Sequence, residues 1–196
     1  MTTHKIMARA SKEADPVGAE CLLHEHGIHL INGEIDYDST DRVITWLLES
    51  SLRKSKKIQH LTLIVNSHGG DLHCSFAIID MMRASALPVH TVGLGQISSS
   101  GLMTFLAGDP GHRVLTPNTS IMSHQWTGET SGKAHELVSA QRYFDITTER
   151  VMAHYRHCTH LTDETITQKL LPPHDVFLTA DEALALNLCD DIRLMG

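Results

Sequence analysis

Ser99 is the residue of this chain whose type and position most directly suggest covalent chemistry. It lies in the segment 95–101, Gly-Gln-Ile-Ser-Ser-Ser-Gly, between an apolar run typical of a strand and one typical of a helix. A serine at such a turn holds its hydroxyl out of the fold, beside helix N–H groups that stabilise negative charge. Serine hydrolases need that arrangement. Taken alone, the turn favours a helix cap, because serine caps helices well.

Candidates for the other parts of a hydrolytic site also lie at the ends of apolar segments. His124 directly follows one short apolar segment, and Asp175 directly precedes another. Gly69 and Gly70 end a third segment and precede a helical pattern, which leaves their N–H groups free to bind an anion. Active-site groups of α/β sheets collect at such strand ends. Nucleophile, base, carboxylate and oxyanion donors must converge in space, which sequence spacing alone does not establish.

Composition limits the class of protein. The chain has 196 residues, of which 41% are hydrophobic and 20% charged, as expected of one globular domain. A net charge of -7 argues against nucleic-acid binding, and no apolar run approaches the roughly 20 residues that span a bilayer. Residues 1–18 lack the apolar stretch of a secretory signal. Four widely spaced cysteines are then expected to be free thiols in the cytoplasm.

Fifteen histidines are unusual for a chain of this length. Two groups have spacings that could place imidazoles together around a metal: His24, His26 and His29, and His154, His157 and His160. No carboxylate or cysteine completes either group in an obvious way. We therefore expect surface histidines and no metal site.

Alternating strand and helix patterns predict an α/β layered fold with right-handed crossovers. Residues 1–20 lack apolar periodicity and are expected to form an N-terminal arm. The run 61–65 is almost continuously apolar, as in a parallel strand buried on both faces. Strands are expected at 27–31, 61–65, 89–94, 113–115 and 120–123, and helices at about 41–53, 71–85, 102–106, 133–156 and after 179.

Local signals predict where several of these elements begin and end. They are helix caps at Ser39 and Thr40, a turn at Asn32-Gly33, a strand break at 66–70, a capping box at 179–182 and a left-handed residue at Asn187. The helix at about 133–156 carries an apolar stripe at spacings of three and four. A helix this long in a small domain is expected to project and to pack against another subunit. The stripe consists of Leu137, Ala140, Phe144, Thr147, Val151 and Tyr155.

Four motifs, in order and with closely matching spacings, resemble the proteolytic subunits of the Clp protease family. They are Asn66–Gly70, Gly95–Gly101, Met122–Gln125 and Asp175–Ala183, and the resemblance runs from about Leu22 to Ile192. It implies a ClpP/crotonase-like layered α/β fold, a ββα superhelix, with a projecting handle helix. Residues 21–196 would then form the peptidase domain, with the handle at about 125–156. Residues 1–20 would form an arm that could serve as an axial loop.

The resemblance also implies roles for individual residues. Ser99 would be the nucleophile, His124 the general base and Asp175 the carboxylate that orients it. An oxyanion would be held by N–H groups of Gly70 and Ser100. Substrate would lie as an added strand beside Gly69, Leu72, Gln125 and Trp126. Packing is an equally good interpretation of Trp126. No metal or other cofactor is implied, since only a partner unfoldase would use ATP.

The resemblance further implies partners. Family members stack two seven-membered rings around a chamber, and an AAA+ unfoldase feeds unfolded polypeptides into it. This chain has Thr62, Ile64 and Ala84 where the family offers aromatic side chains to the unfoldase. These differences weigh against docking of a standard unfoldase. His174 and Trp126 replace an arginine and a proline, which weighs against the usual contact between rings, and His68 replaces a proline.

The sequence therefore predicts a serine endopeptidase that cleaves unfolded proteins and short peptides within a ring chamber. One alternative is a non-catalytic or regulatory ring subunit, although such subunits usually lack a triad member and all three are present here. A second alternative is an acyl-CoA hydratase or thioesterase of the related crotonase type. That chemistry would not need Ser99, His124 and Asp175 together.

Overall fold

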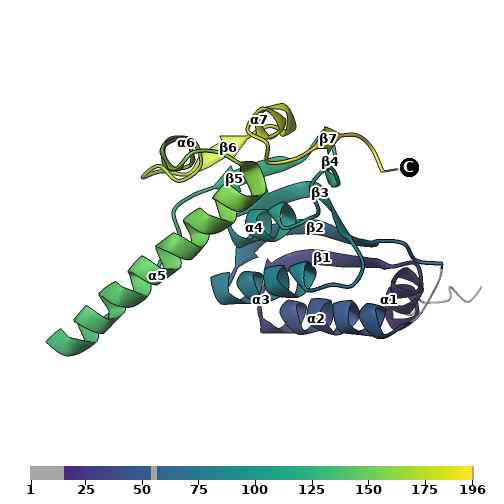
Figure 1. Ribbon diagram of the computed structural model, residues 1–196, viewed down its shortest axis with the longest axis horizontal. Coiled ribbons are helices and arrows are strands. Elements are labelled where there is room, and N and C mark those ends of the chain that lie inside the picture. The colour runs from purple at the N-terminus through teal and green to yellow at the C-terminus, as the bar shows by residue number, and fades with distance from the viewer. Residues whose placement is uncertain (1–15, 54–56, 196) are drawn as a thin grey trace, which may run out of the picture.

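A computed structural model describes residues 16–53 and 57–195 of the chain. Its described part contains a seven-stranded sheet with the order β1-β2-β3-β4-β7, in which these neighbours are parallel (Figure 1). β5 pairs with the second half of β3, and β6 runs antiparallel to β5. The strands are β1 (Ile28–Ile35), β2 (Leu61–Gly70), β3 (Val89–Ser98), β4 (Arg113–Leu115), β5 (Ser120–Ser123), β6 (Val176–Leu178) and β7 (Asp191–Ile192).

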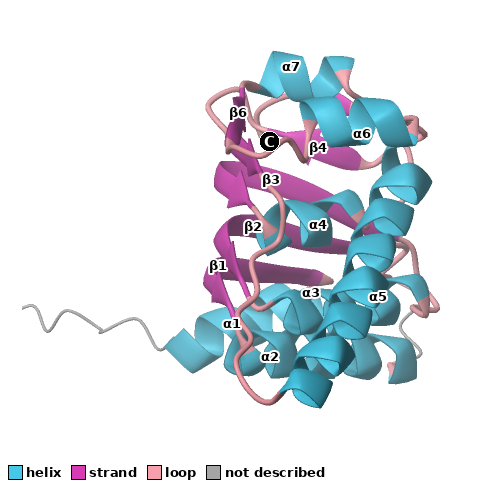
Figure 2. Cartoon of the chain, turned by 90° about the vertical axis from the view of Figure 1, so that its left-hand side faces the viewer, coloured by secondary structure: helices cyan, strands magenta, loops and turns pink. Residues whose placement is uncertain are grey.

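Helices connect and cover these strands, and the predicted α/β layered fold is confirmed. α2 packs on α3, α3 packs on α4, and α4 packs on β2 and β3. The long helix α5 extends well beyond the sheet (Figures 1 and 2). Within the described ranges, no helix combines the length and apolar character needed to cross a bilayer. The helices are α1 (Pro16–Glu25), α2 (Tyr37–Leu52), α3 (Leu72–Arg83), α4 (Ser100–Leu106), α5 (Ala134–Thr159), α6 (Asp163–Lys169) and α7 (Ala180–Ala185).

β2 is buried on one face rather than two. Leu61, Leu63 and Val65 are fully buried in the core, whereas Thr62 and Ile64 on the opposite face are only partly buried. The expectation of a strand buried on both faces was therefore wrong for this chain. An apolar run does not by itself say whether both faces are covered, because covering depends on the neighbouring layers.

β1, β2 and β3 each continue past the point where the sequence predicts a break. Asn32-Gly33 forms a bulge within β1 instead of a turn, and the segment 66–70 completes β2 instead of ending it. The side chain of Asn66 bridges β1 and β3 where the pairing is irregular. Its Nδ2 donates to Asn32 Oδ1 at 2.7 Å, and its Oδ1 accepts from the Gln96 N–H at 3.1 Å. Strand pairing thus overrides local turn signals and carries β2 up to the glycine pair.

Helix caps agree with the sequence in one case and differ in another. The cap of α2 is Asp36, not Ser39 or Thr40. The Ser39 N–H donates to Asp36 Oδ1 at 2.8 Å, and the Asp36 N–H donates to Ser39 Oγ at 3.0 Å. Ser39 is thus the third residue of a capping box. The predicted capping box of Thr179 before α7 is confirmed, as is the left-handed conformation of Asn187.

The buried residues of α5 lie toward its C-terminal end. Thr147, Val151 and Tyr155 of the predicted stripe are buried, and the Tyr155 hydroxyl pairs with Ser123 Oγ at 2.9 Å. Leu137, near the other end of the stripe, is 44% exposed. The N-terminal half of α5 therefore projects as the predicted handle (Figure 1). At the other end of the chain, residues 1–15 of the expected arm lie outside the described residues, and residues 16–20 belong to α1.

Candidate active site

Ser99 occupies a strained turn between β3 and α4. Its backbone has φ 54° and ψ −125°, a conformation that L residues rarely adopt. The Ser99 N–H donates to the Met122 carbonyl of β5 at 2.9 Å, which holds the turn in place. Ser99 stands at the N-cap position of α4, but its side chain makes no capping hydrogen bond. The helix-cap interpretation of this side chain is therefore wrong, and the hydroxyl is available for another partner.

Two glycines allow β2 to approach this turn. Gly69 has φ +104°, and a Cβ there would lie 2.8 Å from the Ser99 Cβ and 2.9 Å from the Ser98 carbonyl oxygen. Gly70 has φ +148°, and a Cβ there would lie 2.2 Å from the Ile35 carbonyl oxygen. Both positions are thus restricted to glycine by conformation and by space. The close approach places the end of β2 directly against the serine turn.

Ser100 is the first residue of α4, where a backbone N–H has no acceptor within the helix. Its carbonyl accepts hydrogen bonds from Ser75 Oγ and Thr104 Oγ1, each at 3.0 Å. The Ser100 hydroxyl is buried without a hydrogen-bond partner. Ser100 therefore offers this turn its backbone rather than its side chain.

His124 and Asp175 meet because β5 and β6 pair in antiparallel register. Ser123 pairs with Val176, so the residue after β5 and the residue before β6 lie at the same end of the ladder. His124 Nε2 lies 2.8 Å from Ser99 Oγ. His124 Nδ1 lies 3.9 Å from Asp175 Oδ1, longer than a hydrogen bond, and the aspartate side chain is 57% exposed.

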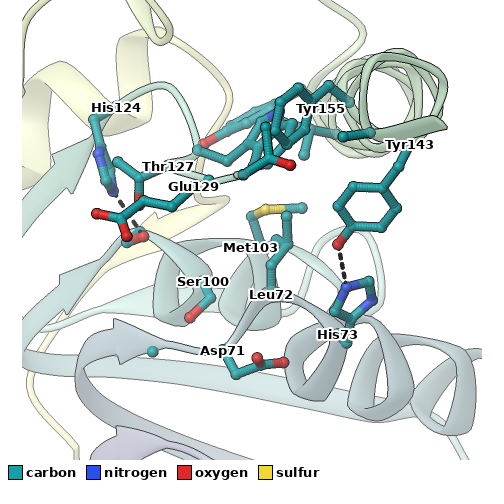
Figure 3. Close-up of a pocket in the computed structure, with 18 of the residues that line it drawn as sticks. Asp71, Leu72, His73, Ser100, Met103, His124, Thr127, Glu129, Tyr143 and Tyr155 are labelled. Atoms are coloured by element: carbon teal, nitrogen blue, oxygen red, sulfur yellow. Dashed lines mark hydrogen bonds between the residues drawn. The ribbon is translucent and has the colours of Figure 1, made fainter. Parts of the chain in front are cut away.

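A cavity of about 650 Å³ opens in front of these groups (Figure 3). Its lining includes Ser99, His124, Gly70 and Ser100, together with Leu72 and Trp126 from the predicted substrate-binding set. Gly69, Gln125 and Asp175 are outside the lining, although Gly69 supports Ser99 from behind.

The two residues after His124 point in different directions. Gln125 Nε2 donates to the Leu171 carbonyl at 2.9 Å, so this side chain holds the adjacent loop rather than facing the cavity. Trp126 Nε1 donates to Thr148 Oγ1 of α5 at 3.1 Å, and its ring packs against Phe144 at a centroid distance of 5.2 Å. Trp126 is thus both a cavity wall and a packing residue of the handle.

The structure adds cavity residues that the sequence did not single out as site residues. Asp71, His73 and Met103 line the side formed by α3 and α4, and Tyr143 lines the side formed by α5 (Figure 3). His73 and the Tyr143 hydroxyl form a hydrogen bond that joins α3 to the handle. His73 directly follows Leu72, a predicted substrate-binding residue at the start of α3, and this position could have marked His73 as a residue of the site. Nothing in the sequence pairs it with a residue 70 positions away.

A comparison with protein families identifies the relatives of this chain. The model of the family described as Clp protease matches residues 11–194. The chain belongs to the Clp protease family. Family membership supports a Clp-type peptidase, and the predicted fold and family are confirmed.

Histidines of this Clp protease family member are not all at the surface, contrary to expectation. His154 is 3% exposed; its Nε2 donates to the Met103 carbonyl at 2.8 Å, and its Nδ1 accepts from Arg83 at 3.1 Å. This pairing requires a neutral imidazole, and burial lowers the pKa of His154 to about 4. His29 is 4% exposed, and burial also lowers its pKa to about 4.

The two predicted histidine groups behave differently. Among the described residues, His154, His157 and His160 do not bring three ligand atoms together. His24 and His29 do converge, with Nε2 and Nδ1 2.8 Å apart, but the third member of their group is Glu20 and not His26. The expectation that no carboxylate accompanies these histidines was wrong, because Glu20 precedes His24 by one helical turn.

Proposed function

We propose that this Clp protease family member is a serine endopeptidase in which Ser99 is the nucleophile. Ser99 Oγ attacks the peptide carbonyl as His124 Nε2 accepts its proton, and the oxyanion receives hydrogen bonds from the Gly70 and Ser100 N–H groups. His124 then protonates the leaving amine. Water, deprotonated by His124, attacks the acyl-enzyme and releases the second product.

The observation that carries this proposal is the 2.8 Å separation of Ser99 Oγ and His124 Nε2 on the wall of a large cavity. That distance is a direct hydrogen bond between a nucleophile and a base. The positive φ of Ser99 supports the same role, because backbone strain of this kind gathers at active sites. Acyl-CoA chemistry of the crotonase type would require neither feature.

Asp175 is assigned as the carboxylate that orients His124. At 3.9 Å it must move about 1 Å closer to hydrogen-bond Nδ1, which an exposed side chain can do. Catalytic hydrogen bonds often tighten only when substrate binds. The same long distance favours the second candidate, a non-catalytic ring subunit. Intact rings that remain inert toward short peptides would support that alternative.

We propose that substrate is an extended, unfolded polypeptide or a short peptide. Leu72 and Trp126 would flank it, whereas Gln125 would act only through the loop that it holds. No cofactor takes part in this chemistry, and ATP would be used only by a partner unfoldase. Stacked seven-membered rings in the cytoplasm remain the expected assembly. Thr62, Ile64 and Ala84 lack the aromatic rings that the family offers to the unfoldase, which weighs against a standard unfoldase as the partner.

A fluorophosphonate probe tests the nucleophile directly. Wild type and Ser98→Ala should be labelled, and Ser99→Ala should not. Ser98 is a matched control because it is the neighbouring serine, fully buried, with its hydroxyl bonded to Gln96 Nε2 at 3.0 Å. Equal labelling of Ser99→Ala and wild type would remove the assignment. Mass measurement of the intact particle would establish whether rings of seven form, and whether they stack.

A further inference from the structure

We propose that Glu20, His24 and His29 form a binding site for a divalent cation of the zinc class, remote from the serine turn. Glu20 and His24 are four residues apart on α1, so their side chains share one helical face. His29 is the second residue of β1 and faces them across the turn that joins the two elements. The three ligand atoms all lie within 4.8 Å of one another.

The separations of these atoms fit a small cation with modest adjustment. Zinc bonds of about 2.0–2.1 Å in tetrahedral geometry put neighbouring ligand atoms about 3.3 Å apart. The observed separations lie on either side of this value: 2.8 Å between His24 Nε2 and His29 Nδ1, a hydrogen bond whose proton the ion would replace, and 3.9 Å between His24 Nε2 and Glu20 Oε1. Rotations of the two α1 side chains would bring all three lone pairs onto one ion.

One ligand is fixed and two are adjustable. His29 is 4% exposed, and its ring stacks on the buried Trp46 of α2 at a centroid distance of 5.3 Å. The His24 side chain is 18% exposed and that of Glu20 is 46% exposed. The exposed side leaves room for water as a fourth ligand, as in three-ligand zinc sites.

Charges of both signs lie around the cluster. The hollows beside it are lined by four further carboxylates, of which Glu49 is paired with Arg53, and by one guanidinium, Arg42, which acts against a cation. Two nitrogen ligands and one oxygen ligand select zinc-like ions over magnesium or calcium, which prefer oxygen alone. The four carboxylates are Glu34, Asp36, Asp41 and Glu49.

A cation here would fasten α1 to β1. α1 packs on β1, and among the described residues it is the helix nearest the start of the chain (Figure 1). Coordination of one ion by Glu20 and His24 of α1 and by His29 of β1 would lock that packing. The site would therefore control how firmly α1 is held against β1, without touching the cavity of Ser99.

The test uses the full chain, treated with a chelator and then titrated with zinc chloride in a calorimeter. Wild type should bind one ion at this site. Glu20→Gln and His24→Asn should each lower the affinity by more than about tenfold, since loss of even an outer-shell partner costs 10–100-fold. Substitution with Co²⁺ should give the visible absorption of a tetrahedral site in wild type, and His24→Asn should lack it.

Two control variants make the result specific. His26 lies between the ligands in sequence, but its Nδ1 donates to the Leu22 carbonyl at 2.9 Å, so His26→Asn should bind like wild type. The exposed Cys21 adjoins Glu20, and Cys21→Ser should also bind like wild type. No zinc binding by wild type, unchanged affinity in His24→Asn, or loss of binding in Cys21→Ser would each overturn the proposal. Circular dichroism would verify that every variant is folded.

Discussion

The replacement Asp175→Asn tests whether the carboxylate serves His124. The side chain keeps its shape and loses its charge, so the change removes the attraction between the carboxylate and the imidazolium formed during catalysis. At the observed 3.9 Å, that attraction is about 1 kcal/mol in bulk water and about 4 kcal/mol at an effective dielectric constant of 20. These limits correspond to losses in kcat/KM of about 6-fold and about 10³-fold.

The assay is cleavage of a short fluorogenic peptide, which needs no unfoldase. A loss near 10³-fold would mean that the pair is shielded from water during turnover, although the aspartate is 57% exposed in this structure. A loss near 6-fold would mean that the pair of Asp175 and His124 stays exposed to water during turnover. Wild-type activity should then also fall toward that of the variant in 1 M salt, where the screening length is about 3 Å.

The prediction also has a control and a refutation. Asp181, in the first turn of α7, is the next acidic residue along the chain and forms no hydrogen bond or ion pair with His124 in the described structure, so Asp181→Asn should retain wild-type kcat/KM. A loss below about 3-fold in Asp175→Asn would refute the role of Asp175. A loss as complete as that of Ser99→Ala would show that Asp175 does more than attract the imidazolium, and would refute a purely electrostatic role.

Three further substitutions test the glycine beside Ser99, a partly buried ion pair and a buried histidine. Gly69→Ala should lower kcat/KM at least about 100-fold in the peptide assay, because the new Cβ would lie 2.8 Å from the Ser99 Cβ and displace the nucleophile. Arg113→Met should lower the free energy of unfolding in urea by about 3 kcal/mol, because it leaves Asp190, now paired at 2.6 Å, as a partly buried lone charge. For His154, the unfolded chain takes up a proton below pH 6.5, while burial keeps the folded pKa at about 4. Stability should therefore be complete above pH 6.5 and fall by up to about 3 kcal/mol toward pH 4, and His154→Gln should reduce this dependence in urea titrations.

Matched controls separate these effects from general damage. Gly33 has φ +119° with no atom near its Cβ position, so Gly33→Ala should strain the backbone yet leave kcat/KM close to wild type. Arg53 pairs with Glu49 at the surface, and Arg53→Met should change stability by less than about 1 kcal/mol. The side chain of His135 is 77% exposed on the far half of α5, and His135→Gln should keep the wild-type pH dependence. Equal effects of a variant and its control would contradict the corresponding argument.

Local interactions explain the predictions that succeeded. The capping box at Thr179 joins residues three positions apart, and the apolar stripe of α5 follows from helical spacing, so both can be read from neighbouring letters. Some failures were local, such as the cap of α2, which is Asp36 rather than Ser39 or Thr40. Others involve distant partners. The turn expected at Asn32-Gly33 became a bulge, because pairing with β2 and the amide of Asn66 satisfy that stretch.

The sequence by itself determined the chemical types and the order of the candidate site: a serine at a turn, a histidine after a strand, an aspartate before a strand and a glycine pair. Tertiary structure decided which of them meet. Antiparallel pairing of β5 with β6 brings His124 near Asp175, and a hydrogen bond from Ser99 to β5 brings the serine to the histidine. It likewise brought His29 of β1 to Glu20 and His24 of α1, and His26 is not part of that group. The register of the strands and the helix face that packs on the sheet set these distances. Both depend on contacts between residues far apart in the chain.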